Sequence, residues 1–291
     1  MNAIIFGIHG QDGYYLNQLL VDLGIEVIGV SRQKAQVIGS VSDISLVQSL
    51  IQKYKPAYIF HFAAVSDISH ELVWEHQDTI VKGTLNILQS VLDYSPHSKV
   101  FISGSGLQFL NKNLPIQESD LFDPKDAYSL ARIQSVYTAR YFRSKGIKVY
   151  VGYFFNHDSP LRSEKHINQF IVKSALRIKN REQYKLNIRN ANFKKEFLFA
   201  GDAVKAVWYL VNQDTITETV IGSGHAIAIM EWINYCFYSL NLNIEEHLVI
   251  ENNTIPSIHT LVSDPATIIS LGWNPTLSFE GLADLMLTAG L

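Results

Sequence analysis

The residues with the clearest chemical potential form a glycine turn near the start of the chain. Gly7, Gly10 and Gly13 are spaced three residues apart, after a short apolar run and at the opening of a helical pattern. Such a turn lets backbone N–H groups at a helix start approach a pyrophosphate, because no side chains stand in the way. The alternative is a tight turn without a ligand, but its place in the first strand-turn-helix unit favours a dinucleotide. We therefore predict that these glycines bind a cofactor together with Gln11 and Asp12.

A single arginine indicates the type of cofactor. Where a sheet that binds NAD places an acid for the adenosine ribose hydroxyls, this sequence has Ser31 and Arg32. A guanidinium at this place suits a 2′-phosphate, so we expect NADP rather than NAD. The alternative is an arginine that is solvated in a loop.

The elements that must hold these residues alternate regularly through the first half of the chain. Short apolar runs, which predict strands, are separated by segments in which apolar residues have helical spacing. Strands that are apolar throughout and alternate with helices indicate a parallel sheet covered on both faces. The expected fold class is therefore α/β, a doubly wound parallel sheet of the Rossmann type. The predicted strands are 3–6, 26–30, 57–62, 99–103 and 148–153, and the predicted helices are 14–23, 44–53, 80–93 and 129–144.

The alternation loosens after about Asn156, as expected of a smaller C-terminal substrate lobe. We expect residues 1–155 to form the dinucleotide-binding domain, extended by later segments near 186–210, and residues 156–291 to form mainly the substrate lobe. No Pro/Gly linker separates the two, so they should pack together. Short strand-like runs lie among the later helices at residues 185–188, 217–221 and 247–250.

Composition excludes several classes of protein. The chain has 291 residues, 47% of them hydrophobic and 18% charged, so it can fill a sizeable core. The net charge is −3 without a dense block of either sign, which disfavours nucleic acid and anionic membrane surfaces as partners. The single cysteine, Cys236, cannot form an internal disulfide, and the ten histidines lack the paired spacing of a metal site. Because we find neither a membrane-length apolar run nor a secretory signal, we expect a cytoplasmic protein without a bound metal.

Longer stretches of the chain resemble a known superfamily. His61-Phe62-Ala63-Ala64 ends a predicted strand, and Tyr128-Ser129-Leu130-Ala131-Arg132 opens a predicted helix. With the glycine turn, these motifs resemble the extended short-chain dehydrogenase/reductase superfamily. Within it, the chain resembles the GDP-mannose 4,6-dehydratase family over essentially its whole length. Three further stretches carry that likeness: Phe155-Asn156-His157-Asp158-Ser159-Pro160, residues 186–208 and Leu271-Gly272-Trp273-Asn274-Pro275.

The resemblance implies a catalytic pair one helical turn apart. In the superfamily a Tyr and a Lys four residues later form the acid/base group, the Lys lowering the Tyr pKa and holding the nicotinamide ribose. Here the pair is Tyr128 and Arg132, and the arginine keeps the charge and the ribose donors but cannot relay a proton. The alternative for Tyr128 is a partly buried tyrosine without chemistry. The resemblance also implies cofactor contacts from Asp43, Ala63 and Ala64.

The same resemblance reveals losses beside the expected substrate. The dehydratases read Ser-Thr-Ser-Glu-Leu-Tyr after the fourth strand, with Thr bonding the sugar C4 oxygen and Glu taking the C5 proton. This chain has Gly104 and Gly106 at those two positions, so ordinary dehydration lacks its base. The resemblance implies substrate contacts from Ser105, Asn156 and Lys195, the last replacing an Arg. Strand alternation nevertheless points Ser105 away from the face of residue 104.

These observations lead to one main functional prediction and two alternatives. The resemblance implies an NADP-dependent enzyme that acts on a nucleotide-linked sugar, with GDP favoured. Because the base for dehydration is missing, redox chemistry at C4 by a keto reductase, dehydrogenase or epimerase is the main prediction. The alternatives are a 4,6-dehydratase with an atypical base, and a nucleotide-sugar binding protein without hydride transfer. The loop after Arg32 is much shorter than in the dehydratases that the chain resembles, where it supports a tetramer, so the resemblance implies a homodimer paired through helices.

Overall fold

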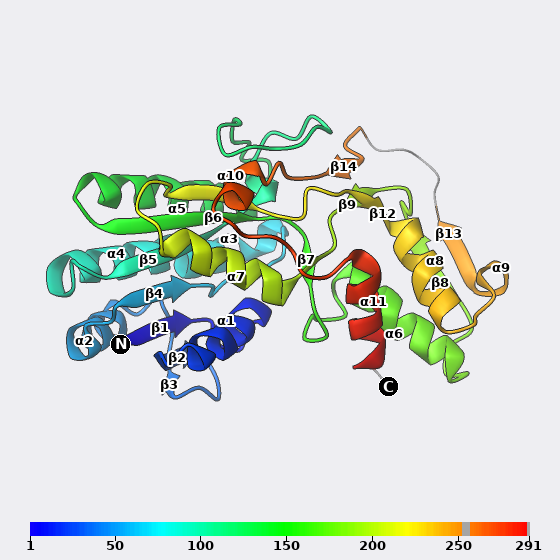
Figure 1. Ribbon diagram of the computed structural model, residues 1–291, viewed down its shortest axis with the longest axis horizontal. Helices are drawn as coiled ribbons and strands as arrows, with labels where there is room; N and C mark the ends of the chain where they lie inside the picture. Colours follow the sequence, from blue (N-terminus) through cyan, green and yellow to red (C-terminus); the bar gives the residue numbers. More distant parts are fainter. Residues whose placement is uncertain (252–256, 290–291) are drawn as a thin grey trace.

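A seven-stranded parallel sheet forms the centre of the molecule. The computed structural model describes residues 1–251 and 257–289, and Figure 1 shows the sheet with helices above and below it. The strand order is β11-β6-β5-β4-β1-β2-β3, and every neighbouring pair is parallel. This arrangement confirms the doubly wound α/β fold. The strands are β1 (Asn2–Phe6), β2 (Glu26–Ser31), β3 (Val37–Ile38), β4 (Tyr58–His61), β5 (Lys99–Ser105), β6 (Lys148–Phe154) and β11 (Glu218–Ile221).

Apolar residues alternate between the two faces of this sheet, and each face has its own layer of helices. In β1, Ile4 and Phe6 face one core, while Ala3 and Ile5 face the other. Burial of both faces explains why these strands are apolar throughout. The first core is covered by α2 (Ile44–Tyr54), α4 (Gly83–Tyr94) and α5 (Ala127–Ser144), and the second by α1 (Gln11–Asp22), α7 (Ala200–Val211) and α10 (Ala266–Ser270).

A smaller lobe packs beside the carboxyl ends of the strands. Its three helices enclose a third core that includes Trp232, Phe197 and Met286 (Figure 1). Short strands complete the lobe: β8 pairs with β13 in parallel, and β9 lies between β12 and β14. The helices are α6 (Ile167–Lys179), α8 (Ile229–Ser239) and α11 (Phe279–Thr288), with the short α9 (Ile244–His247). The strands are β7 (His157–Asp158), β8 (Leu186–Arg189), β9 (Lys194–Lys195), β10 (Leu198–Phe199), β12 (Ile227–Ala228), β13 (Leu248–Glu251) and β14 (Thr260–Leu261).

Two elements differ from the sequence-based expectation. The run at 217–221 was expected among the short strands of the lobe, but it forms β11, the edge strand of the main sheet beside β6. The predicted helix 80–93 begins earlier, because α3 (Val73–His76) and a π-helical segment (Gln77–Lys82) lead directly into α4. A π-helical segment interrupts the apolar spacing of 3.6 residues that predicts an α-helix. The earlier start of this helix could therefore not be predicted from the sequence.

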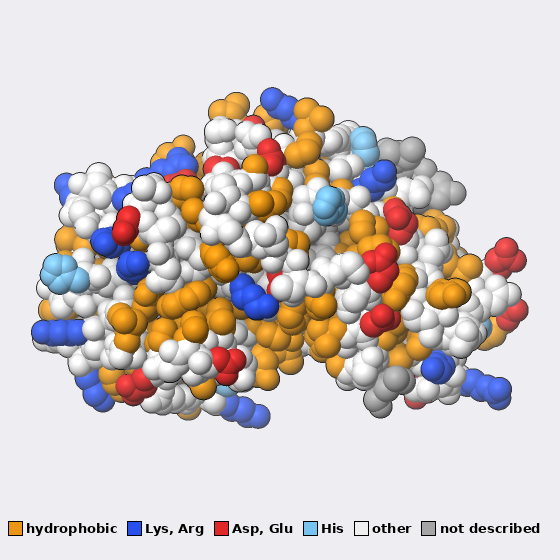
Figure 2. All heavy atoms as spheres, in the orientation of Figure 1, with side chains coloured by type: hydrophobic (Ala, Val, Ile, Leu, Met, Phe, Trp, Pro, Cys, Tyr) orange, Lys and Arg blue, Asp and Glu red, His pale blue; other side chains and the backbone are white. Residues whose placement is uncertain are grey.

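The surface is mixed in character. On the face seen in Figure 2, basic and acidic side chains are interspersed among polar and hydrophobic ones. Within residues 1–251 and 257–289, no helix has both the length and the apolar character needed to cross a membrane.

Candidate active site

Two adjoining cavities lie at the carboxyl ends of the central strands. The first has a volume of about 670 Å³ and lies beyond β1, β2 and β4. The second, of about 420 Å³, extends from the end of β5 to the smaller lobe. Since the strand order reverses beside β1, this is the crevice where doubly wound sheets bind ligands. Both cavities share four wall residues, so they meet: His9, Gly10, Phe62 and Ala64.

The glycine turn fits a pyrophosphate at this junction. Gly7 has a φ of +92°, and a Cβ there would lie 2.7 Å from the Ala63 backbone nitrogen. A Cβ at Gly13 would fall against the Gly7 carbonyl oxygen, so α1 can approach the turn only without that side chain. Gly10 caps α1 without a side-chain hydrogen bond and lines both cavities. The open backbone at this helix start is suited to a phosphate anion.

Gln11 and Asp12, which were predicted to bind the cofactor, use their side chains to hold the smaller lobe. Ser159 Oγ donates to Gln11 Oε1 at 2.8 Å, and Gln11 Nε2 donates to the His157 carbonyl at 3.3 Å. His157 Nε2 lies 2.8 Å from Asp12 Oδ1. These contacts connect the phosphate turn to β7 and the loop after it.

Asp12 and His157 form an ion pair in which His157 is buried and Asp12 is half-buried. Burial alone would lower the pKa of His157, but the Asp12 carboxylate raises it above its usual value. Burial would raise the pKa of Asp12, but the charge and hydrogen bond of His157 lower it. The imidazolium therefore donates to Asp12 and, through Nδ1, to the Phe155 carbonyl at 2.7 Å.

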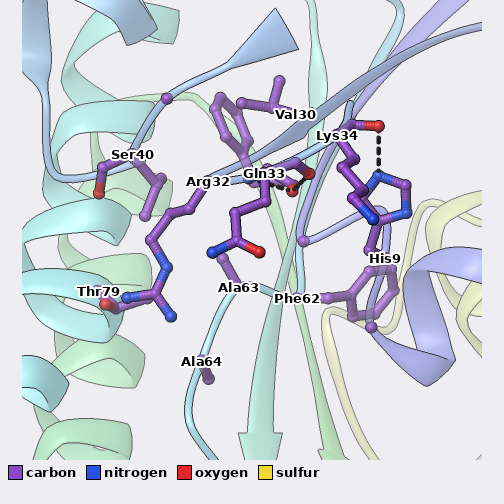
Figure 3. Close-up of a pocket in the computed structure, with 16 residues that line it drawn as sticks. His9, Val30, Arg32, Gln33, Lys34, Ser40, Phe62, Ala63, Ala64 and Thr79 are labelled. Atoms are coloured by element: carbon purple, nitrogen blue, oxygen red, sulfur yellow. Dashed lines mark hydrogen bonds between the residues drawn. The ribbon is translucent and has the colours of Figure 1, made fainter. Parts of the chain in front are cut away.

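Arg32 lines the far end of the first cavity, beyond β2. Figure 3 shows its side chain running toward Thr79, with Ala63 and Ala64 on the neighbouring wall. Arg32 Nη1 lies 2.6 Å from Glu75 Oε1, an acid of α3 that the sequence analysis missed. The two residues are 43 positions apart, and no local sequence pattern predicts a contact over that distance. The pair is therefore seen only in the structure.

Asp43, in contrast, does not line the cavity. Its carboxylate caps α2 and accepts hydrogen bonds from the backbone nitrogens of Ser45 at 3.0 Å and Leu46 at 3.3 Å. The cavity wall near it is formed by Ser40 and Val41 instead. An Asp directly before a helix is a strong capping residue, which accounts for its place.

Tyr128 and Arg132 lie together on the first turns of α5, beside the second cavity. Both line it, and the guanidinium carbon lies 5.0 Å from the centre of the Tyr128 ring. The Tyr128 hydroxyl has no hydrogen-bond partner among the described residues, so it is available to a ligand. Arg132 Nη1 donates to the Ser103 carbonyl and, at 2.8 Å, to the Ser103 hydroxyl. The arginine is thus held against the end of β5.

Aromatic rings fill the space beside both glycines of β5 and the turn that follows. A Cβ at Gly104 would lie 2.6 Å from Tyr153 Cδ1, and a Cβ at Gly106 would lie 2.9 Å from the Phe155 ring. Tyr153 is fixed in place because its hydroxyl donates to Glu218 at 2.5 Å. In this chain the rings of Tyr153 and Phe155 therefore occupy the space that side chains at residues 104 and 106 would need.

The second cavity lacks a free carboxylate. Among its described wall residues, Asp12 is the only acid, and it is bound to His157. Glu118 instead accepts from Thr219 Oγ1 at 2.9 Å, and Asp126 caps α5. The described wall residues of this cavity therefore offer no free carboxylate that could take a carbon-bound proton as the dehydratase Glu does.

The predicted substrate residues occupy different places. Asn156 and Ser105 line the second cavity, but Ser105 Oγ accepts from the Leu107 nitrogen at 3.2 Å. Lys195 is buried and is not a wall residue of either cavity. Burial lowers the pKa of Lys195 to about 8, with smaller effects of Asp158 and Arg162.

The smaller lobe also contributes two basic side chains, Arg162 and His166, to the described wall of the second cavity. Arg162 and His166 line it, and burial followed by the Arg162 charge lowers the pKa of His166 to about 4. Arg162 Nε lies 3.4 Å from Asp158 Oδ1. Arg162 lies two residues after the family-like stretch that ends at Pro160, whereas no pattern in the sequence points to His166. The charge of Arg162 favours an anionic ligand, to which neutral His166 can donate one hydrogen bond. Within the described part of the chain, no group of three or more His, Cys, Asp or Glu residues could hold a metal ion.

Comparisons with known proteins agree with this geometry. Among solved structures, UDP-glucose 4-epimerase of Thermotoga maritima with UDP-glucose has a TM-score of 0.85 at 19% identity, covering 99% of this chain and 98% of that chain. The protein named RMD of Pseudomonas aeruginosa, complexed with NADPH, has a TM-score of 0.86 at 18% identity, with coverages of 99% and 98%. These likenesses concern the fold.

Relatives and a family model go further. GDP-mannose 4,6 dehydratase 1 of Arabidopsis thaliana is 27% identical over 99% of this chain and 89% of its own length. GDP-mannose 4,6-dehydratase of Vibrio cholerae serotype O1 is 24% identical over 99% of this chain and 93% of its own length. The family model described as GDP-mannose 4,6 dehydratase matches residues 4–286. The resemblance seen in the sequence is thereby confirmed, and the chain belongs to the GDP-mannose 4,6 dehydratase family.

Proposed function

We propose that this protein is an NADP-dependent enzyme that carries out redox chemistry at C4 of a GDP-linked sugar. The observation that carries the proposal is the open Tyr128 hydroxyl in a cavity whose one acidic wall residue, among those described, is already paired. Family membership supports a nucleotide sugar as the substrate, and the names of the relatives favour GDP. The glycine turn and Arg32 line the adjoining cavity and support NADP as the cofactor.

The chain supplies what such a reaction needs from a protein. NADP, when bound, accepts or donates the hydride at C4. Tyr128 exchanges the proton of the C4 oxygen, and the Arg132 guanidinium, whose carbon lies 5.0 Å from the centre of the ring, keeps a positive charge beside the reacting groups. Arg162 and the buried charge of Lys195 attract the diphosphate. Dehydration would also require removal of the C5 proton, for which Gly106 supplies no base.

A second candidate is a binding protein without hydride transfer. Arg132 Nη1 is already committed to Ser103, which leaves fewer donors for the nicotinamide ribose. A 4,6-dehydratase with an atypical base is the remaining alternative, and family membership favours it.

We also propose a homodimer formed through α4 and α5. The outer face of this helix pair exposes Leu85, Tyr137 and Tyr141, large side chains that a second copy would cover. Sedimentation that gives a monomer at micromolar concentration would exclude this assembly.

The proposed function is tested by the absorbance of NADPH in two reactions of the purified protein. NADPH should be consumed with GDP-4-keto-6-deoxymannose, or formed from NADP⁺ with a GDP-hexose. Tyr128→Phe should reduce turnover by about 10²- to 10⁴-fold while cofactor affinity stays nearly unchanged. Tyr238→Phe, at an exposed tyrosine of α8 outside both cavities and the proposed dimer face, is the control and should keep full activity. Equal activity of the Tyr128 variant and the wild type would remove Tyr128 from the reaction.

A further inference from the structure

Arg32, which lines the far end of the first cavity, is bound to Glu75, an acid of α3 that is not itself a wall residue. Arg32 Nη1 and Glu75 Oε1 are 2.6 Å apart, and Thr79 Oγ1 lies 3.5 Å from the same carboxylate oxygen. The side chains remain accessible, with exposed fractions of 66% for Arg32 and 33% for Glu75. The pair therefore rests at the surface rather than in the core, where a ligand can reach and rearrange it.

The Arg32 and Glu75 pair lies near the place where a doubly wound sheet binds the adenosine ribose of a dinucleotide. Arg32 follows β2, and Thr79 lies on the π-helical segment next to α3; both line the first cavity (Figure 3). In a doubly wound sheet, the end of the second strand faces the adenosine ribose of the dinucleotide. An acid there accepts hydrogen bonds from the two ribose hydroxyls of NAD, whereas an arginine there binds the 2′-phosphate of NADP. In this chain Arg32 lines the cavity after β2, and Glu75 of α3 reaches the same guanidinium from outside the cavity wall.

We propose that Glu75 is a specificity-determining residue that competes with the 2′-phosphate of NADP for Arg32. The proposal rests on the proposed function, in which the first cavity takes a pyridine dinucleotide. With NADP, the Arg32 guanidinium leaves Glu75 for the phosphate, and the carboxylate opposes the phosphate charge. With NAD, Arg32 stays paired, and Glu75 is an acceptor within the region of the ribose hydroxyls. The preference of the wild type for NADP over NAD is therefore smaller than it would be in a protein that has Arg32 but lacks the Glu75 charge.

The size of the effect follows from the exposure of the pair. Exposed ion pairs change an equilibrium constant by about five-fold at most. Repulsion between the carboxylate and a dianionic phosphate adds a factor of similar size at this exposure. Removing the Glu75 charge should therefore tighten NADPH binding by about three- to twenty-fold. NADH binding should stay the same or weaken, because NADH lacks the phosphate and loses an acceptor.

The experiment is a fluorescence titration of the full chain with NADPH and with NADH at low salt. The variants are Glu75→Gln, which keeps the shape but removes the charge, Arg32→Ala, and the double variant. Glu71→Gln is the matched control, since it removes an exposed acid from the same segment and Glu71 has no recorded hydrogen bond or ion pair. Circular dichroism checks that each variant is folded.

The expected result is tighter binding of NADPH, and not of NADH, to Glu75→Gln, together with a smaller gain when Arg32 is also replaced. An equal change for both cofactors, or a gain no larger than that of Glu71→Gln, would overturn the role of Glu75 while leaving NADP binding intact. Failure of the wild type to bind either cofactor would instead overturn the proposed function, and the role of Glu75 with it.

Discussion

Lys195 shows how burial can make a single substrate-binding group sensitive to pH. Its pKa is lowered to about 8 by burial, so the cation is lost as the pH rises through that value. In the family-like role proposed for it, Lys195 must be charged to attract a diphosphate. Arginine at the same position would keep its charge throughout this range.

The first prediction concerns the pH dependence of GDP binding. Between pH 7 and pH 9 the affinity of the wild type should fall by about three- to ten-fold, as Lys195 loses its proton. Lys195→Arg should remove most of this fall. Calorimetric titration with GDP at both pH values measures it. Parallel pH profiles for the two proteins would show that another group, and not Lys195, is responsible.

At the scale of elements, β5 and β6 carry the departure from the dehydratase pattern. Gly104 in β5 stands beside Tyr153 in β6, and the hydroxyl of Tyr153 is bound to Glu218 of β11. Arg140 and Arg143 of α5 bind the same Glu218 carboxylate, at 2.7 and 2.9 Å. A side chain at residue 104 would therefore disturb a network that joins three strands and a helix.

The second prediction is the stability of Gly104→Thr. Its Cβ would stand 2.6 Å from the Tyr153 ring, and overpacking of this kind costs about 1 to 3 kcal/mol. Urea unfolding should show this loss, whereas Gly281→Ala, where a Cβ has ordinary contacts of 3.6 Å, should be neutral or slightly stabilising. Unchanged stability of Gly104→Thr would mean that Tyr153 moves freely. A side chain at residue 104 therefore calls for a smaller residue at 153, and one at residue 106 for a smaller residue at 155.

The junction between α1 and β7 is a second contact between elements, through Asp12 and His157. His157 has a raised pKa, so its contribution to stability is complete below 6.5 and declines as the pH rises through the folded-state value. Asp12 has a lowered pKa, so its contribution is complete above 3.8 and declines as the pH falls through the folded-state value. The ion pair is therefore complete between these two pH values.

The third prediction follows from this window. Asp12→Asn should lower the free energy of unfolding by about 1 to 3 kcal/mol near pH 5.5, and by less near pH 8.5. Denaturant unfolding of both proteins at the two pH values measures the difference. A loss that is equal at both values would contradict a charged His157 in the folded protein.

At the scale of the whole molecule, the sequence predicts the sheet well, because buried parallel strands must be apolar throughout. Runs such as 57–62 and 148–153 matched β4 and β6 to within one or two residues. The partner of β11 was not predictable, since a four-residue run fits either an edge strand or a strand of the lobe. Its position in the main sheet depends on pairing with β6, a strand more than 60 residues earlier in the chain.

In the site, as in the sheet, local motifs can be predicted from the sequence, whereas contacts between distant residues cannot. The glycine turn is local, so its spacing identifies it, and both Tyr128 and Arg132 lie on one helix face as expected. The contacts of Arg32 with Glu75, Arg132 with Ser103 and Asp12 with His157 span tens of residues, and no periodicity encodes them. The sequence therefore predicts which residues belong to the site, but only the three-dimensional structure shows which side chains they contact.

The central claim is hydride transfer at sugar C4 without loss of water. It is tested most directly by incubating the purified protein with NADP⁺ and GDP-hexoses, GDP-mannose among them, that carry deuterium at C4, followed by mass spectrometry of cofactor and sugar. The account predicts deuterium in the reduced cofactor with at least one of these sugars, and no 4-keto-6-deoxy product. Formation of a 4-keto-6-deoxy sugar at enzymatic rates would contradict it, as would a complete lack of deuterium transfer both in this reaction and from deuterated NADPH to GDP-4-keto-6-deoxymannose.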